Sequence, residues 1–193
     1  MKLNLLHTAL AALLMAGTAQ AMAQTQDVPA TVSISGVLNN VNAGCVVTLD
    51  KEVVYMQNKV SHLPQQGNQP YNPTPVNAYV SGDHKNGQNN VVCSEAVKAG
   101  HIALKFTGTP DNADGNVLAN SYVESGGAKG VGVGIYGPTK QPIVVNTGTL
   151  ENLALLSDLR GSAQFNLELV KLANQEVTPG AVTSSLTVEI ERL

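Results

Sequence analysis

Apolar and polar residues alternate in several separate segments of this chain, which is the pattern of half-buried β-strands. The clearest segments are 102–106, 131–135, 165–169 and 182–192. Clusters of Gly, Pro, Asn and Asp lie between them, as is typical of the turns that connect short strands. The sequence therefore predicts an all-β fold, an antiparallel sandwich in which each sheet has one solvated face.

The segment from Val182 to Arg192 has the most regular alternation. One face carries Val182, Ser184, Leu186, Val188 and Ile190, and the other carries Thr183, Ser185, Thr187, Glu189 and Glu191. No residues follow it that could build another strand, so we expect the edge of its sheet to need cover from another segment.

The first 23 residues have the features of a secretory signal peptide. Lys2 precedes an apolar stretch from Leu5 to Met15, and small residues follow at 19–23. Cleavage after Ala21 or after Ala23 fits equally well, and we take Gln24 as the first mature residue. The remaining chain of about 170 residues is enough for one domain with a substantial core.

Export favours disulfide formation, because an even number of cysteines in an oxidising compartment normally pairs. Cys45 and Cys93 are the two cysteines of the chain, so one disulfide is possible. The formal net charge is −3, and the basic residues are scattered. This distribution does not indicate a nucleic-acid partner.

A further alternating segment precedes Cys45. Its apolar or small positions are Val28, Ala30, Val32, Ile34, Gly36 and Leu38. They predict a strand outside the part of the chain that the disulfide closes. The pattern alone leaves two possibilities open: the strand belongs to the sheet of another molecule, or it is the first strand of its own domain.

The chain has no recognisable catalytic or metal-binding motif. The mature histidines His62, His84 and His101 do not have a metal-ligand spacing, and no Gly-x-Ser-x-Gly motif is present. Gly126–Gly134 superficially resembles a phosphate-binding loop but lacks its context, and it predicts a strand that another backbone approaches closely. We therefore expect no enzymatic activity, no metal and no cofactor.

Two pairs of carboxylates are expected to be solvated rather than catalytic. Asp111 and Asp114 lie in a predicted turn, and Glu189 and Glu191 lie on the polar face of the last strand.

Two regions depart from the strand pattern. Residues 61–88 are rich in Pro, Asn, Gln and Gly, which predicts a long surface connection containing a short strand at 76–80. The leucines at 150, 153, 155, 156 and 159 are compatible with a short helix that ends before Gly161, or with no helix there.

Several short motifs occur in a fixed order along the mature chain. They are the arm ending in Gly36-Val37-Leu38 before Asn42-Ala43-Gly44-Cys45, then Leu104-Lys105-Phe106-Thr107-Gly108, Gly134-Ile135-Tyr136 and Val177-Thr178-Pro179-Gly180-Ala181. In their order and spacing the chain resembles the pilin subunits of chaperone-usher fimbriae of the type 1 kind.

The resemblance implies an incomplete immunoglobulin-like sandwich that lacks its last strand and is completed by donor-strand exchange. Residues 24–40 would be the donor arm, with Val28, Ala30, Val32, Ile34, Gly36 and Leu38 entering a groove, and residues 41–193 the pilin domain. The groove would lie beside the last strand, where Val182, Leu186, Val188, Ile190, Arg192 and Leu193 would bind first a periplasmic chaperone and then the arm of a neighbouring subunit, at an outer-membrane usher.

The implied function is that of a structural subunit of a surface fimbria that contributes to cell adhesion, exported through the periplasm. A minor adaptor pilin is a variant of this reading. A self-contained secreted immunoglobulin-like module that binds a ligand through loops such as 61–88 is the alternative. The penultimate residue is Arg192, where these pilins usually carry an aromatic residue. Because the chaperone binds the last strand in this family, the difference affects the detail of chaperone recognition.

Overall fold

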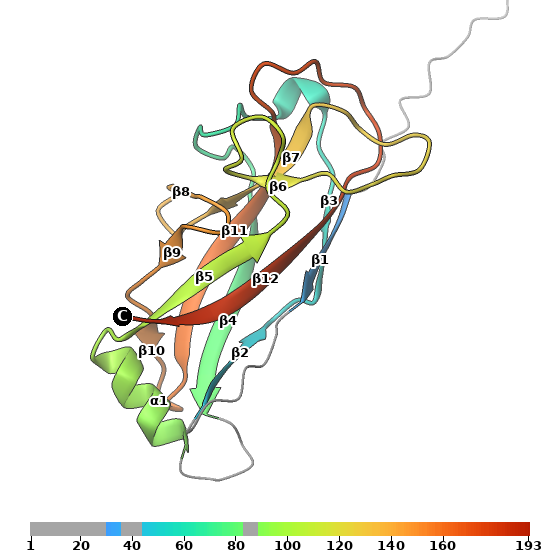
Figure 1. Cartoon of the computed structure of the whole chain (residues 1–193). Coiled ribbons are helices and arrows are strands. Elements are labelled where there is room, and N and C mark those ends of the chain that lie inside the picture. The colour runs from blue at the N-terminus through green and yellow to red at the C-terminus, as the bar shows by residue number, and fades with distance from the viewer. Residues whose placement is uncertain (1–29, 36–43, 83–88) are drawn as a thin grey trace, which may run out of the picture.

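A computed structural model describes residues 30–35, 44–82 and 89–193, which form two β-sheets packed face to face with one α-helix at one end (Figure 1). The predicted signal peptide lies outside the described residues, as do Val28, Gly36, Leu38 and His84. The predicted all-β sandwich is confirmed.

The first sheet contains the last strand of the chain near its middle. Its order is β3 (Val53–Met56), β1 (Ala30–Ser35), β12 (Thr183–Arg192), β5 (Ile102–Gly108) and β9 (Thr149–Leu150). Neighbouring strands are antiparallel except for β1 and β12, which are parallel.

The second sheet is antiparallel throughout. Its order is β2 (Cys45–Leu49), β4 (Thr74–Gly82), β11 (Gly161–Lys171), β7 (Val131–Tyr136) and β6 (Leu118–Ala119), with β10 (Ala154–Leu155) paired to β11 and β8 (Pro142–Ile143) paired to β7. Each strand that the sequence predicts is therefore present, most of them longer than the alternating segment itself.

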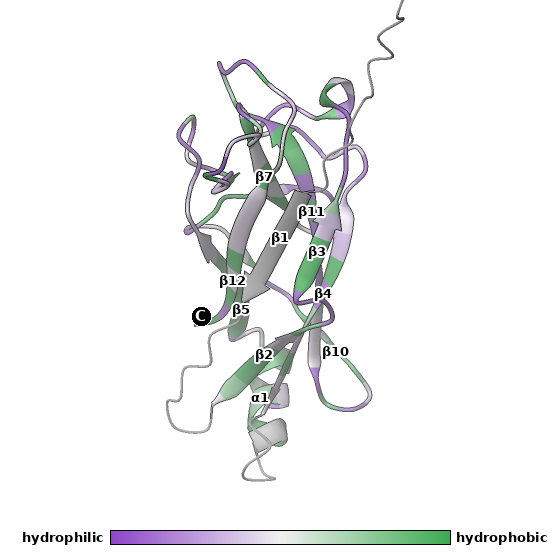
Figure 2. Cartoon of the chain, turned by 90° about the vertical axis from the view of Figure 1, so that its right-hand side faces the viewer, coloured by the Kyte–Doolittle hydropathy of each residue, from purple (hydrophilic) through white to green (hydrophobic). Residues whose placement is uncertain are grey.

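The core lies between the two sheets. Phe106 of β5 and Phe165 of β11 meet edge to face, with ring centroids 5.0 Å apart, and both are fully buried. Such aromatic pairs stabilise a core beyond the area they bury. Figure 2 shows apolar residues along the strands and hydrophilic residues in the loops at the end near β7 and β11.

The glycines of β7 allow other groups to approach the strand closely. A Cβ on Gly132 would lie 2.7 Å from the carbonyl oxygen of Leu118, and one on Gly134 would lie 2.6 Å from the hydroxyl of Tyr136. Neither position has room for a side chain. The sequence reading of this segment as a closely approached strand is confirmed.

The helix α1 (Asn89–Lys98) was not predicted. It ends two residues before Gly100, whose φ of +71° is a left-handed conformation that glycine adopts readily. The N–H of Gly100 donates to Val97 O, and that of His101 donates to Ala96 O. Glycine two residues after Lys98 was the sequence signal for this helix end.

The disulfide ties α1 to the second sheet. Cys45 in β2 and Cys93 in α1 are bonded, with Cα atoms 5.6 Å apart and a separation of 48 positions in sequence. The expected pairing is therefore present. Because Cys93 is fully buried, the bond is enclosed on the helix side.

The helix suggested by the leucines of 150–159 is absent. Two short strands, β9 and β10, occupy this segment. Asn152 and Leu159 have positive φ values of 58° and 66°, which interrupt a helix. The N–H of Leu156 donates to Arg160 O across the turn into β11, so a hairpin forms instead.

Within the predicted surface connection 61–88, the described residues 61–82 are more structured than the sequence suggested. The strand at 76–80 is confirmed but extends over Thr74–Gly82 as β4, with Val76, Ala78 and Val80 fully buried. A 3-10 turn, η1 (Val60–His62), lies just before the region's buried Leu63. Strand β4 and Leu63 are therefore components of the core, whereas many of the residues between them are exposed.

The expectation that Asp111 is solvated is wrong. Asp111 is 6% exposed, and its carboxylate accepts hydrogen bonds from the N–H groups of Ala113 and Val117 and from Nε2 of Gln66, at 2.7, 3.1 and 2.9 Å. Burial raises the pKa of Asp111, but these hydrogen bonds outweigh it and hold the pKa below the ordinary value. The carboxylate thus organises the loop before β6.

Glu168 in β11 is also buried, although its position in the alternation predicted a solvated side chain. Its carboxylate accepts hydrogen bonds from the N–H groups of Tyr71 and Asn72, at 2.8 and 2.9 Å. Burial and the neighbouring Glu168 raise the pKa of Tyr136 well above its usual value. The carboxylate anchors the loop before β4 to the sheet.

Removal of the disulfide by Cys45→Ser together with Cys93→Ser should lower the free energy of unfolding by about 4 kcal/mol, because the bond closes a long loop in the unfolded chain. Urea unfolding of the purified protein measures this loss. An unchanged midpoint would mean that the bond does not stabilise the domain.

The contribution of Asp111 should depend on pH. Because its folded pKa is below the ordinary value of 3.8, its stabilising effect is fully present above that value and is lost as the pH falls through the folded pKa. Urea midpoints of the wild type and Asp111→Asn should therefore differ at pH 7 and converge in acid. A difference that persists unchanged in acid would contradict this assignment.

Candidate functional site

The strand β12 crosses the molecule from the loops at one end toward the end that carries α1 (Figure 1). On one side it pairs with β5, from Leu186 opposite Gly108 to Arg192 opposite Ile102. Val182, Ser184, Leu186 and Val188 are each at most 3% exposed, and Ile190 is partly buried. The predicted inner face of the last strand is confirmed.

The other side of β12 is paired with β1. The two strands are parallel, from Thr31 opposite Thr183 to Ser35 opposite Thr187. The far side of β1 pairs with β3, from Ala30 opposite Met56 to Ser33 opposite Val53. The backbone of Ala30–Ser35 therefore occupies a slot between β3 and β12, which we call the β3–β12 slot.

The register places alternate arm positions opposite the inner face of the sheet. Position 32 stands opposite Ser184 and Val54, and position 34 stands opposite Leu186. Val54, Ser184 and Leu186 are all buried. Positions 32 and 34 of the arm are thus in register with residues that face the core, as the alternation requires.

The β3–β12 slot is one strand wide. Neighbouring strands lie about 4.8 Å apart, so β3 and β12 are separated by about 9.6 Å. Without a strand between them, the facing edges of Val53–Met56 and Thr183–Thr187 would lose their backbone partners. The slot is therefore a site for an extended polypeptide segment.

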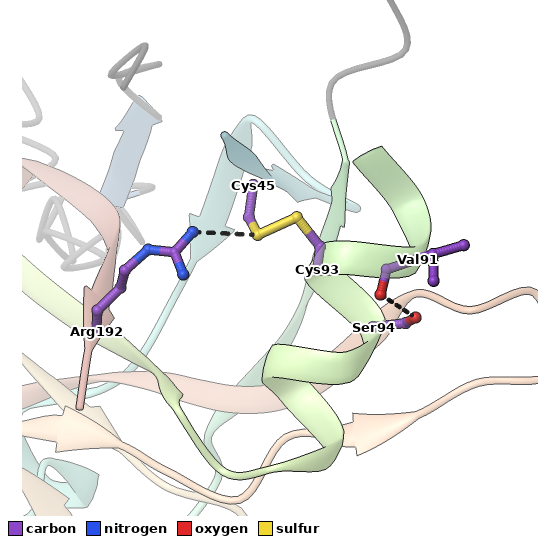
Figure 3. Close-up of a disulfide and its surroundings, with 5 residues drawn as sticks. All are labelled: Cys45, Val91, Cys93, Ser94 and Arg192. Atoms are coloured by element: carbon purple, nitrogen blue, oxygen red, sulfur yellow. Dashed lines mark hydrogen bonds between the residues drawn. A yellow bond between two sulfur atoms is a disulfide. The ribbon is translucent and has the colours of Figure 1, made fainter. Parts of the chain in front are cut away.

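The end of β12 lies beside the disulfide (Figure 3). The Nη2 atom of Arg192 is 3.8 Å from Sγ of Cys45, and the N–H of Leu193 donates to His101 O at 3.0 Å. Both side chains are exposed. Arg192 thus connects the last strand of the first sheet to the disulfide of the second.

The start of β12 is held by Asn120. Its Nδ2 donates to the carbonyl oxygens of Ala128 and Ala181, at 2.9 and 3.1 Å. Its Oδ1 accepts from the N–H groups of Tyr122 and Thr183, both at 3.0 Å. One side chain therefore joins the loop after β6, the chain before β7 and the first residues of β12.

Ser184 and Gly180 reinforce this connection. The hydroxyl of Ser184 donates to Ala119 O. A Cβ on Gly180 would lie 2.4 Å from Gly126 O, so the two loops are in close backbone contact. No sequence pattern indicated the role of Asn120, because its partners Ala181 and Thr183 are distant in the chain.

The predicted groove residues differ in burial. The inner face of the last strand buries Val182, Leu186 and Val188, and Ile190 is partly buried. The exposed residues Arg192 and Leu193 lie at the disulfide end. Their binding roles stay predictions. Of the predicted donor residues, Ala30, Val32 and Ile34 belong to β1, and Val28, Gly36 and Leu38 lie outside the described residues.

Within the described ranges, no group of three or more His, Cys, Asp or Glu residues lies close enough to hold a metal ion. In the same part of the chain, no helix has the length and apolar character needed to cross a membrane.

The sequence identifies the class of protein. A family model described as "Fimbrial protein" matches residues 32–191. The chain therefore belongs to this family and is a structural subunit of a fimbria, which assembles with other pilin subunits into a surface pilus. No curated protein matches the sequence.

Two solved structures are similar to the chain. The P pilus rod subunit PapA is 18% identical, with 82% of this chain and 100% of that chain covered and a TM-score of 0.45. An antigen and type I fimbria protein of Burkholderia pseudomallei is 14% identical, with 85% and 92% covered and a TM-score of 0.38.

Replacing Asn120 by Ala should lower the free energy of unfolding by about 2 kcal/mol, because four hydrogen bonds to backbone groups are lost. Asn112→Ala is the matched control, since Asn112 is exposed and its side chain accepts a single hydrogen bond from Gln175. Urea unfolding compares the two variants. Equal midpoints would show that Asn120 does not secure the start of β12.

Proposed function

We propose that this fimbrial subunit polymerises by donor-strand exchange, in which the β3–β12 slot of one subunit receives the arm, residues 24–40, of the next. The observation that supports this is the register of β1, with positions 32 and 34 opposite the buried Ser184 and Leu186. Any arm with the same alternation satisfies the same edge.

The direction of the chain's own arm follows from its attachment. Cys45, which follows the arm, lies beside Arg192 at the end of β12. An arm that runs parallel to β12 ends close to Cys45, whereas a reversed arm would need the connection to return along the sheet. The arm of a neighbour has no such restriction.

An arm that enters from a neighbour can run antiparallel to β12. With Ile34 kept opposite Leu186, this direction sets Leu38 opposite Val182, Gly36 opposite Ser184 and Val28 opposite Arg192. The even-numbered arm positions from 32 to 38 then stand opposite buried positions of the last strand, and Val28 stands opposite the exposed Arg192. Antiparallel pairing is also slightly more stable per residue than parallel pairing, which favours exchange.

Two further partners are expected because the edge of β12 in the empty slot would have unpaired backbone groups. A periplasmic chaperone would fill the β3–β12 slot before assembly, because an unpaired strand edge promotes aggregation. An outer-membrane usher would then be the place of exchange. Arg192 and Leu193, exposed at the end of β12, would contact the chaperone. A shaft subunit and a minor adaptor both need this slot and this arm.

One observation favours a second candidate function, a self-contained secreted module that binds a ligand through its loops. The backbone of Ala30–Ser35 pairs within its own chain's sheet, as that alternative expects. The two functions differ in whether the arm leaves the slot, which can be measured.

Ile34→Asp should abolish fibre formation while the chaperone-bound subunit stays folded, because a charge at an inward register position cannot enter the core without a large cost. Ser33→Asp is the matched control, since position 33 stands opposite the exposed Ser185, and it should assemble. Electron microscopy of surface fibres reads the result. Normal fibres from Ile34→Asp would contradict the donor role.

Paired cysteines distinguish the two arm directions. Ser33→Cys with Ser185→Cys, which are partners in the parallel register, should cross-link within one chain and block assembly. Ser35→Cys with Ser185→Cys should cross-link between chains in fibres, giving a covalent ladder on a denaturing gel. The paired Cα separation in a sheet suits a disulfide. Fibres without that ladder would contradict the antiparallel register.

A further inference from the structure

The attachment of the arm determines which end of a donor subunit reaches its acceptor. Cys45 follows the arm and is bonded to Cys93 in α1. From Leu38 to Cys45 the chain can span at most about 25 Å. The α1 end of a donor subunit must therefore lie close to the point where its arm leaves the acceptor's slot.

The requirement that subunits form a linear fibre determines at which end of the slot the arm leaves. A parallel arm would leave at the Arg192 end of the acceptor and bring the α1 ends of two molecules together, which favours closed pairs. An antiparallel arm leaves at the Thr183 end and gives a head-to-tail contact that repeats. In the fibre, α1 of the donor therefore faces the start of the acceptor's β12, at the opposite end of the molecule (Figure 1).

The start of β12 presents an exposed apolar residue on a fixed loop. Val123 is 94% exposed. Its loop is tied at both stems, because Ser121 N–H donates to Thr183 O at 2.7 Å and Ala181 N–H donates to Gly126 O at 2.9 Å. Asn120 adds its four hydrogen bonds to the same stems. A side chain on such a loop loses little freedom when it binds.

The outer face of α1 presents the other apolar residues. Val91 and Val92 are 56% and 49% exposed, whereas Cys93 and Val97 are buried against the sheets. Figure 3 shows the side chain of Val91 pointing away from the disulfide. Adjacent valines on the solvent side of a helix form an exposed apolar surface, and no described residue covers it.

We propose that these two surfaces are a subunit junction, in which Val123 of one copy packs on Val91 and Val92 of the next copy. This rests on the proposed function, since the exchanged, antiparallel arm brings the two ends together. The junction is heterologous, so each subunit uses its Val123 loop toward one neighbour and its α1 toward the other.

Charge substitutions test the junction in the full chain. Val123→Asp and Val92→Asp should each slow fibre extension about fivefold, because an anchor residue of an interface is lost. Val144→Asp is the matched control, since Val144 is 41% exposed and belongs to neither surface. Equal extension rates for all three variants would overturn the proposal, and unchanged urea midpoints confirm that each variant is folded.

Cross-linking gives a second readout. Val123→Cys with Val92→Cys should form disulfides between chains in oxidised fibres, while either single variant gives none. Fibres that assemble normally without this cross-link would overturn the junction and leave strand exchange intact. Failure of strand exchange itself would appear separately, as normal fibres from Ile34→Asp.

Discussion

The backbone pairing at the edge of β12 is the interaction on which the rest of the structure depends. On one side β5 satisfies this strand, and on the other side it needs a further strand between itself and β3. The slot is one strand wide, its inner positions are buried, and its edges consist of backbone donors and acceptors. A segment with alternating apolar residues meets all three requirements, whether it comes from the same chain or from another.

The two ends of β12 are fixed by different means. At its start, Asn120 and the close contact of Gly180 with the loop after β6 hold the strand to the second sheet's connections. At its end, Arg192 lies against the disulfide that ties β2 to α1. These contacts hold both ends of β12, the strand along which an incoming segment pairs.

The alternation of residues predicted most of the fold, because each sheet has one face in the core and burial there selects apolar side chains. It predicted β5, β7, β11, β12 and the inner positions Leu186 and Val188. The alternation failed to predict burial where long-range hydrogen bonds determine which polar residues are buried. The buried carboxylate of Glu168 accepts from backbone N–H groups of a distant loop, and that of Asp111 accepts from the distant Gln66 as well as from N–H groups of its own loop. Helix α1 depends on a disulfide and on packing rather than on a strong apolar periodicity.

The most direct measurement is the stability of a chain that lacks residues 24–43, with and without a synthetic peptide of residues 28–38. The account predicts that the shortened chain is unfolded or aggregates alone, and that the peptide restores a cooperative urea transition, whereas a peptide carrying Ile34→Asp does not. A shortened chain that folds by itself with the stability of the complete protein would contradict it.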